Sequence, residues 1–206
     1  MEGSPLRRLR KLPRERKAEV TRKTRETKVK IYLNLDRRDR VEVKIERRFF
    51  KHMLESFAFH AGFGFRVEAE EYEPPDDHHL VEDVALTLGE ALLKALNVKA
   101  GIRRFGWAAV PMDEALILVA LDLSGRGYFQ SDLSFNHKQI GDLSAEMVNH
   151  FFQSLAFSGK FTLHLAALRG VNDHHKAEAS FKAVGLALAQ AVRKTGKETP
   201  SLKGVL

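Results

Sequence analysis

DDHHLVEDVALTLGEAL at residues 76–92 and NDHHKAEASFKAVGLAL at residues 172–188 are two copies of one motif, 96 residues apart. Upstream, HMLESFAF at residues 52–59 corresponds to HFFQSLAF at residues 150–157, with a spacing of 98 residues. A third match, between residues 65–69 and 161–165, returns to a spacing of 96. A chain that repeats over this length is expected to fold as two similar halves.

Apolar periodicity predicts strands, a helix, a strand and a helix in each half. The predicted strands are residues 27–35, 41–45, 63–72, 104–110, 115–123, 128–135 and 161–168. The predicted helices are residues 49–60, 80–96, 144–157 and 175–194. Residues 41–45 are expected to pair with 27–35. This order predicts an α+β fold of two tandem halves, each a mixed sheet with two helices on one face.

Composition excludes several classes of protein. The chain has 206 residues, of which 44% are hydrophobic, and no Cys, so disulfides and thiolate zinc sites are excluded. No apolar run approaches 18 residues and no secretory signal begins the chain, so we expect a cytoplasmic protein with no membrane partner.

The net charge of +7 is confined to one end of the chain. Residues 1–30 hold twelve Lys or Arg against four Asp or Glu, and the rest of the chain sums to −1. We therefore expect no nucleic-acid partner. The predicted organisation is a basic N-terminal tail (1–17), a first half (18–99) and a second half (100–206).

The two HHxxE motifs indicate metal chemistry. On a helix, His78 and Glu82 lie one turn apart on the same face and can bind one metal together. His79 lies about 100° further round and should face a different metal or a neighbouring chain. His174, Glu178 and His175 repeat this arrangement.

The repeat-equivalent His52 and His150 are natural further ligands, giving six His and two Glu. Divided between two sites, each metal receives three imidazoles and one carboxylate, which leaves open positions on an octahedral Mn²⁺ or Fe²⁺. In the alternative interpretation, the His pairs only begin helices that Asp77 and Asp173 cap, and His52 and His150 are core residues.

Other side chains suit an anionic, phosphate-bearing substrate. His60 follows His52 by eight residues and is expected to touch the substrate. The remaining candidates are Arg104, Arg126, Lys182, Ser201 and Lys203, the last two in a turn-rich C-terminal loop.

Together these segments resemble the imidazoleglycerol-phosphate dehydratase family of histidine biosynthesis, from about Ala18 to Leu206. The resemblance is carried by RKTRET (22–27), HMLESFAFH (52–60), DDHHLVED (76–83), GIRRFGWAAVPMDEAL (101–116), LDLSGR (121–126), VNHFF (148–152), NDHHKAEASFKA (172–183) and PSLKGVL (200–206). It implies two fused halves of the ribosomal protein S5 domain 2-like type, a homo-oligomer of 24 subunits built from trimers, and two Mn²⁺ per active site.

The resemblance also implies roles for individual residues. The metal ligands are His52, His78, His79, Glu82, His150, His174, His175 and Glu178. The substrate contacts are Glu26, His60, Arg104, Arg126, Lys182, Ser201 and Lys203, where the C-terminal residues form a substrate loop. The catalytic carboxylates are Glu26, Glu82 and Glu178, and Glu26 and Glu178 are alternatives for the base. The implied reaction dehydrates imidazole glycerol phosphate to imidazole acetol phosphate.

This chain departs from the family pattern before the first ligand. A Gly-rich stretch ending in Asp is usual, whereas this chain has KIERRFFKH at residues 44–52, with Lys51 beside His52. Two alternatives therefore stand beside the dehydratase. One is a catalytically weakened paralogue that keeps a metal-stapled assembly, and the other is an unrelated two-metal hydrolase.

Overall fold

The computed structural model describes residues 15–72 and 75–204. The first half forms a mixed sheet in the order β1-β2-β4-β3, from β1 (Lys17–Lys23), β2 (Thr27–Asn34), β3 (Val41–Lys44) and β4 (Gly64–Glu71). The second half forms the sheet β5-β6-β10-β7, from β5 (Phe105–Met112), β6 (Ala115–Asp122), β7 (Tyr128–Ser131) and β10 (Thr162–Arg169). In both sheets one outer pair is parallel, β3 with β4 and β7 with β10, and the other pairs are antiparallel.

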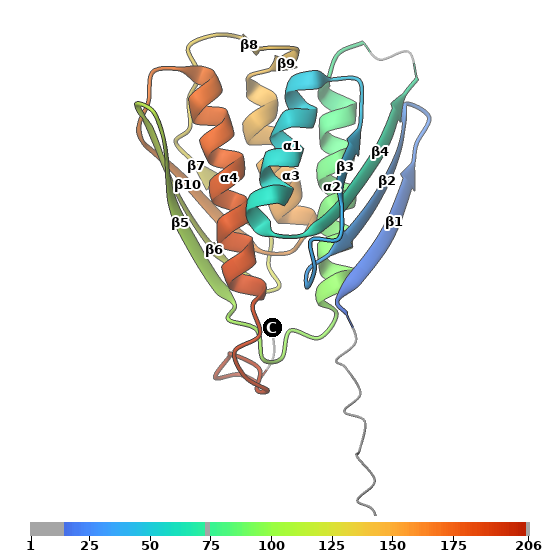
Figure 1. Ribbon diagram of the computed structural model, residues 1–206, viewed down its shortest axis with the longest axis vertical. Coiled ribbons are helices and arrows are strands. Elements are labelled where there is room, and N and C mark those ends of the chain that lie inside the picture. The colour runs from blue at the N-terminus through green and yellow to red at the C-terminus, as the bar shows by residue number, and fades with distance from the viewer. Residues whose placement is uncertain (1–14, 73–74, 205–206) are drawn as a thin grey trace, which may run out of the picture.

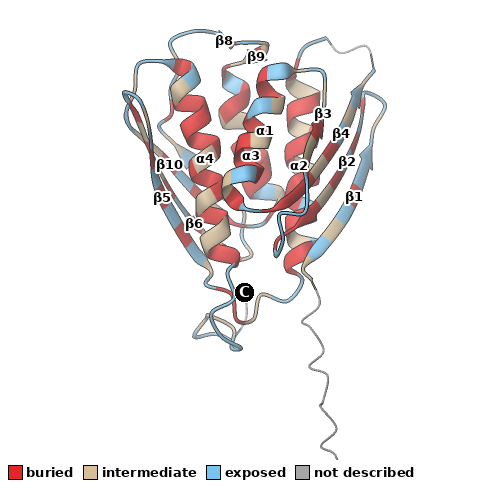
Figure 2. Cartoon of the chain, viewed as in Figure 1, coloured by how far each residue is buried: buried red, intermediate tan, exposed pale blue. Residues whose placement is uncertain are grey.

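In the described part of the chain, four helices fill the space between the two sheets (Figure 1). They are α1 (Arg48–Ala61), α2 (His78–Leu96), α3 (Glu146–Ser158) and α4 (Asp173–Val192). Helices α1 and α2 cover the first sheet, and α3 and α4 cover the second. Buried residues line the helices and the inner faces of the strands (Figure 2). The predicted α+β fold of two similar halves is therefore confirmed.

The strands differ from the prediction in three places. β1 was not predicted, because Val20 is its single buried residue and apolar alternation is absent. β3 does not pair with β2 as expected, but lies parallel to β4 with Val41 opposite Phe65. The strand predicted over 128–135 ends at Ser131, and the chain then forms a small hairpin of β8 (Gln139–Ile140) and β9 (Leu143–Ser144).

Most of the predicted N-terminal tail lies outside the described residues. Its last residues belong to the fold, because Lys17 opens β1 and the Arg16 guanidinium bonds to the Asp36 carboxylate and to the backbone carbonyl of Val192 at 2.6 Å. Among the described residues, no helix has the length and apolar character needed to cross a bilayer.

The halves meet through their helices, with α1 packed on α4 and α2 on α3. Repeat-equivalent glycines allow the close approach. A Cβ at Gly185 of α4 would lie 2.5 Å from the carbonyl oxygen of Phe57 in α1, and one at Gly89 of α2 would lie 2.6 Å from the nitrogen of Gly159, just after α3. The spacing of each helix pair is therefore set by a residue without a side chain.

We expect Gly185→Ala to push α1 away from α4. Overpacking of this kind costs about 1–3 kcal/mol, which corresponds to a fall in melting temperature of roughly 3–10 °C for a chain of this size. Thermal unfolding followed by circular dichroism measures the change. Gly196→Ala is the matched control, because a Cβ at this position would meet no other atom within 4 Å. Equal melting temperatures for the two variants would contradict the proposed constraint.

Candidate metal centre

The candidate ligands all lie near the N-terminal ends of the four helices. His78 begins α2 and His174 is the second residue of α4. His52 and His150 are each the fifth residue of their helix, in α1 and α3. The repeat therefore places equivalent side chains at equivalent depths in the helical layer.

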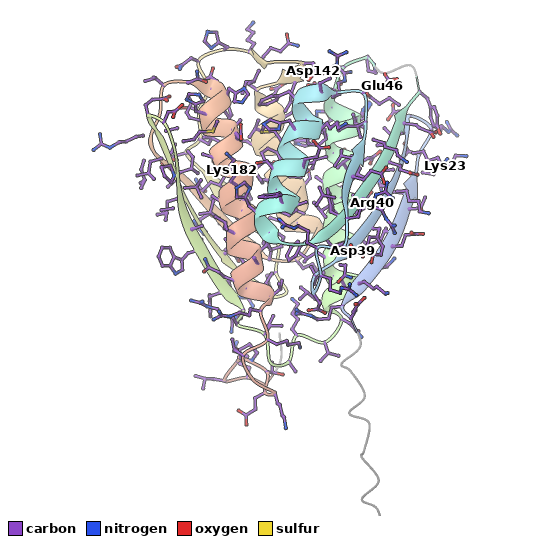
Figure 3. The ribbon with its side chains drawn as sticks, in the orientation of Figure 1. Lys23, Asp39, Arg40, Glu46, Asp142 and Lys182 are labelled. Atoms are coloured by element: carbon purple, nitrogen blue, oxygen red, sulfur yellow. The ribbon has the colours of Figure 1, made fainter. Side chains whose placement is uncertain are left out.

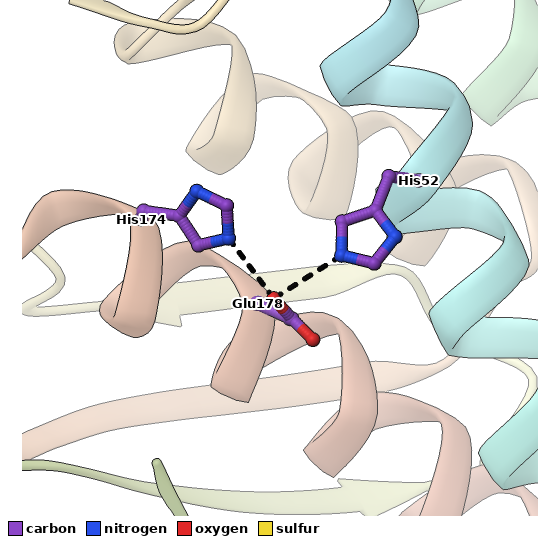
Figure 4. A group of neighbouring side chains, drawn as sticks. All are labelled: His52, His174 and Glu178. Atoms are coloured by element: carbon purple, nitrogen blue, oxygen red, sulfur yellow. Dashed lines mark hydrogen bonds and ion pairs between the residues drawn. The ribbon is translucent and has the colours of Figure 1, made fainter. Parts of the chain in front are cut away.

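The first cluster combines His52 of α1 with His174 and Glu178 of α4 (Figure 4). Nε2 of His52 and Nε2 of His174 lie 3.2 and 3.1 Å from the same carboxylate oxygen of Glu178. One ligand thus comes from the first half of the chain and two come from the second. The two imidazoles are half-exposed, whereas Glu178 is buried.

In the second cluster the contributions of the two halves are reversed, with two ligands from the first half and one from the second. It combines His78 and Glu82 of α2 with His150 of α3. The rings of His78 and His150 lie 4.4 Å apart between centroids, and Nε2 of His150 lies 3.5 Å from Oε1 of Glu82. Among the described residues, Nε2 of His150 is buried and has no hydrogen-bond partner.

Both clusters fit a transition-metal ion. In each of them, one ligand atom from every residue lies within 4.8 Å of the others. Imidazole and carboxylate together suit Mn²⁺, Fe²⁺ and Zn²⁺. Burial acts to raise the pKa of Glu178, but hydrogen bonds from Lys182 and the two His outweigh it and lower this pKa, which keeps the carboxylate ionised. An unpartnered imidazole nitrogen in the second cluster is likewise expected of a ligand.

His79 and His175 lie outside both clusters, so one chain brings together two imidazoles per cluster rather than the expected three. Nδ1 of His175 lies 2.7 Å from Glu114, and Nδ1 of His79 lies 3.3 Å from Glu26. Glu26 and Glu114 occupy the corresponding β1–β2 and β5–β6 turns.

Glu114, which contacts His175, was not among the site residues predicted from the sequence. Hydrogen bonds from His175 and from the backbone of Asn172 lower the pKa of Glu114 to about 2. A carboxylate that holds Nδ1–H of a histidine leaves Nε2 directed outward for a metal. Its position 88 residues after Glu26, in the equivalent turn, was the signal available.

Four of the predicted substrate-binding residues, Arg104, Arg126, Ser201 and Lys203, lie at the opposite end of the molecule. The backbone N–H of Arg104 donates to the carbonyl of Ala191, which follows His174 by 17 residues of α4, or roughly 25 Å. The Arg104 guanidinium bonds to both Asp122 oxygens, at 2.6 and 2.9 Å, and to the carbonyl of Pro200 at 2.9 Å.

Arg104 thus holds the C-terminal segment that contains Ser201 and Lys203. Arg126 lies in the connection between β6 and β7 at this same end. A single chain therefore does not bring these four residues to its own His–His–Glu clusters.

Three further residues lie along the helices. Lys182 stands midway down α4 and pairs with Glu178 at 2.8 Å (Figure 3). His60 lies near the end of α1, where its Nδ1 is 2.8 Å from the carbonyl of Ser56. Lys51 pairs with Glu55 at 3.8 Å, so an acidic neighbour accompanies the cation next to His52.

The capping alternative does not account for the two aspartates. Asn172 caps α4 by accepting from the N–H groups of His174 and His175, and neither Asp77 nor Asp173 bonds to its own helix as a cap. Asp77 accepts from Ser144, and Asp173 accepts from the backbone of Asn136 and His137.

The sequence model of the imidazoleglycerol-phosphate dehydratase family matches residues 45–188. A relative from Metallosphaera sedula described as imidazoleglycerol-phosphate dehydratase is 49% identical, and the match covers 93% of this chain and 99% of the relative. One from Caldivirga maquilingensis with the same description is 48% identical over the same shares.

Solved structures agree with these relatives. A crystal structure from Pyrococcus furiosus described as IGPD, the abbreviation of imidazoleglycerol-phosphate dehydratase, has a TM-score of 0.80 and 36% identity to this chain. The match covers 91% of this chain and 100% of that one. The imidazoleglycerol-phosphate dehydratase structure from Staphylococcus aureus has a TM-score of 0.75 and 32% identity, covering 87% and 99%. The chain therefore belongs to the imidazoleglycerol-phosphate dehydratase family.

Proposed function

We propose that the chain dehydrates imidazole glycerol phosphate to imidazole acetol phosphate at Mn²⁺ sites completed by neighbouring subunits of a homo-oligomer. As a member of its family it is a hydro-lyase of histidine biosynthesis. The observation that carries the proposal is the pair of His–His–Glu clusters, each assembled from both halves of the chain.

The proposed ligands are the eight residues implied by the repeat: His52, His78, His79, Glu82, His150, His174, His175 and Glu178. Two Mn²⁺ in one site would lower the pKa of the substrate imidazole and thereby favour loss of the adjacent hydroxyl. Within the chain, one Glu178 oxygen lies 3.2 and 3.1 Å from Nε2 of His52 and Nε2 of His174, so this carboxylate holds both imidazoles in place. His79 and His175, outside the clusters, are the ligands we assign to metals shared with another subunit.

The distance between the two ends of the chain supports an oligomeric site. The backbone of Arg104 lies roughly 25 Å from His174 of the same chain. Because Arg126, Ser201 and Lys203 lie at the same end of the molecule as Arg104, we propose that all four bind the phosphate at a neighbour's clusters. A repeated contact of this kind closes into a symmetric assembly when its rotation permits, and the assembly that we propose is a 24-mer built from trimers. Lys182 and His60 complete the proposed substrate contacts.

Exposed apolar residues support burial against another copy. Phe105, Trp107, Tyr128 and Leu168, on three strands of the second sheet, are each at least half exposed. Large aromatic side chains exposed on one sheet, here Phe105, Trp107 and Tyr128, are typical of a subunit interface.

Glu26 is the carboxylate that we assign as the base. Glu178 and Glu82 lie within the clusters, whereas the Glu26 side chain is 55% exposed beside His79. A carboxylate at this position is free to remove the proton from C2 of the substrate's glycerol chain, while bound phosphate orients the reacting carbons.

We expect Glu26→Gln to reduce kcat by on the order of 10²–10⁴-fold, the usual contribution of a general base. Steady-state kinetics with imidazole glycerol phosphate and added Mn²⁺ measures the change, and elemental analysis should find the wild-type metal content. Glu90→Gln, which alters only a surface pair with Lys94, is the control. Full activity in Glu26→Gln would contradict the assignment, and no turnover by wild type would favour the weakened paralogue.

We expect Glu178→Gln to lose Mn²⁺ and to form a smaller particle. The change removes the charge that two imidazoles share, and a metal between subunits contributes to assembly. Size-exclusion chromatography with light scattering measures the mass, before and after chelation of the wild-type protein. A wild-type mass that survives complete metal removal would contradict metals at the interface.

A further inference from the structure

The second half contains a segment that the first half lacks. β3 ends at Lys44 and α1 begins at Arg48, whereas β7 ends at Ser131 and α3 begins only at Glu146. Residues 132–145, which we name the clasp, therefore replace a connection of three residues. The clasp carries the β8–β9 hairpin and lies above the helices in Figure 1.

The clasp bonds to the N-terminal ends of three ligand-bearing helices. The Asp142 carboxylate bonds to the start of α1, Ser144 donates to Asp77 just before α2, and Asn136 and His137 donate to Asp173 at the start of α4. Each of these helices carries a proposed ligand within its first five residues. One segment thus holds ligand helices from both halves of the chain.

Asp142 is the cap of α1, although it lies 94 residues away from Arg48. One of its oxygens accepts from the N–H of Arg48 at 2.5 Å, and the other accepts from the N–H of Phe49 at 2.8 Å. Arg47, at the N-cap position, makes no capping side-chain hydrogen bond to the helix. Figure 3 shows Asp142 at this end of α1.

The hairpin turn is shaped for this contact. Gly141, immediately before Asp142, has φ +61°, and a Cβ there would lie 2.9 Å from Cβ of Phe49. A larger residue would hold the turn away from the helix.

The start of α1 needs such a partner. Its first turn contains no acidic residue, and Arg47, Arg48 and Lys51 place positive charge where the helix dipole is already positive. A carboxylate that accepts two free N–H groups offsets both effects.

We propose that Asp142 is a positioning residue for His52, one turn further along α1, and thereby for the His52–His174–Glu178 metal site. The expected effect of Asp142 on metal binding rests on the function proposed above. The cluster is sensitive to the position of α1, because His52 is its single ligand from that helix. The second cluster lies on α2 and α3, so loss of the Asp142 cap should affect the two sites unequally.

The test compares Asp142→Ala with Asp142→Asn and with Lys138→Ala, an exposed change within the clasp. Mn²⁺ is titrated into each chelator-treated protein by electron paramagnetic resonance. Anomalous diffraction from crystals soaked at limiting Mn²⁺ then gives a separate occupancy at each cluster. Melting temperatures of the metal-free proteins report stability.

We expect Asp142→Ala to weaken Mn²⁺ binding about fivefold, the factor that corresponds to loss of a typical cap. The occupancy should fall at His52–His174–Glu178 and not at His78–Glu82–His150. Asp142→Asn should recover most of the loss because Asn caps helices about as well as Asp. Lys138→Ala should match wild type.

Two results would overturn the positioning role while leaving the proposed function intact: an equal fall in occupancy at both clusters, or a lower melting temperature with unchanged Mn²⁺ binding. Failure of the wild-type protein to bind Mn²⁺ would instead refute the proposed function, and the positioning role with it.

Discussion

The packing of α1 on α4, and of α2 on α3, is the constraint on which both clusters depend. Each half packs its helices on one face of its sheet, which leaves the outer apolar side of that helical layer uncovered. The helical layers of the two halves cover each other. Because the ligands lie near the helix N-termini, the same burial that stabilises the fold brings His52 to Glu178 and His150 to Glu82.

This arrangement explains why neither half forms a cluster by itself. Adjacent turns of one helix supply a His and a Glu, and the next imidazole must come from the helix packed against it. In this chain that helix belongs to the other half in both cases. The glycines at 89 and 185 set how closely the helices approach, and so how closely the donor atoms can converge.

Local patterns predicted the four helices and most strands because their apolar faces are long and regular, as in α1 with Phe50, Met53 and Phe57 buried. The ligand types followed from repetition of the HHxxE motif. Long-range features were not predictable in the same way. His52 joins ligands of the second half and His150 joins ligands of the first half, and these are tertiary contacts. β1 lacks apolar alternation, and Asp142 caps a helix that begins 94 residues away in the sequence. No local sequence signal encodes which polar side chain satisfies a helix end elsewhere in the chain.

The two ends of the molecule have different chemistry, and this difference bears on how the proposed enzyme is built. Carboxylates and imidazoles gather at the helix N-termini, while Arg104, Arg126 and Lys203 gather near the C-terminal end of α4. A substrate that joins an imidazole to a phosphate through three carbons is far shorter than the roughly 25 Å between these ends. It can therefore touch both kinds of residue only where one subunit's basic end meets another's clusters. Under the proposed function, assembly is therefore a condition for binding the whole substrate, because a single subunit keeps Arg104, Arg126 and Lys203 apart from its own His–His–Glu clusters.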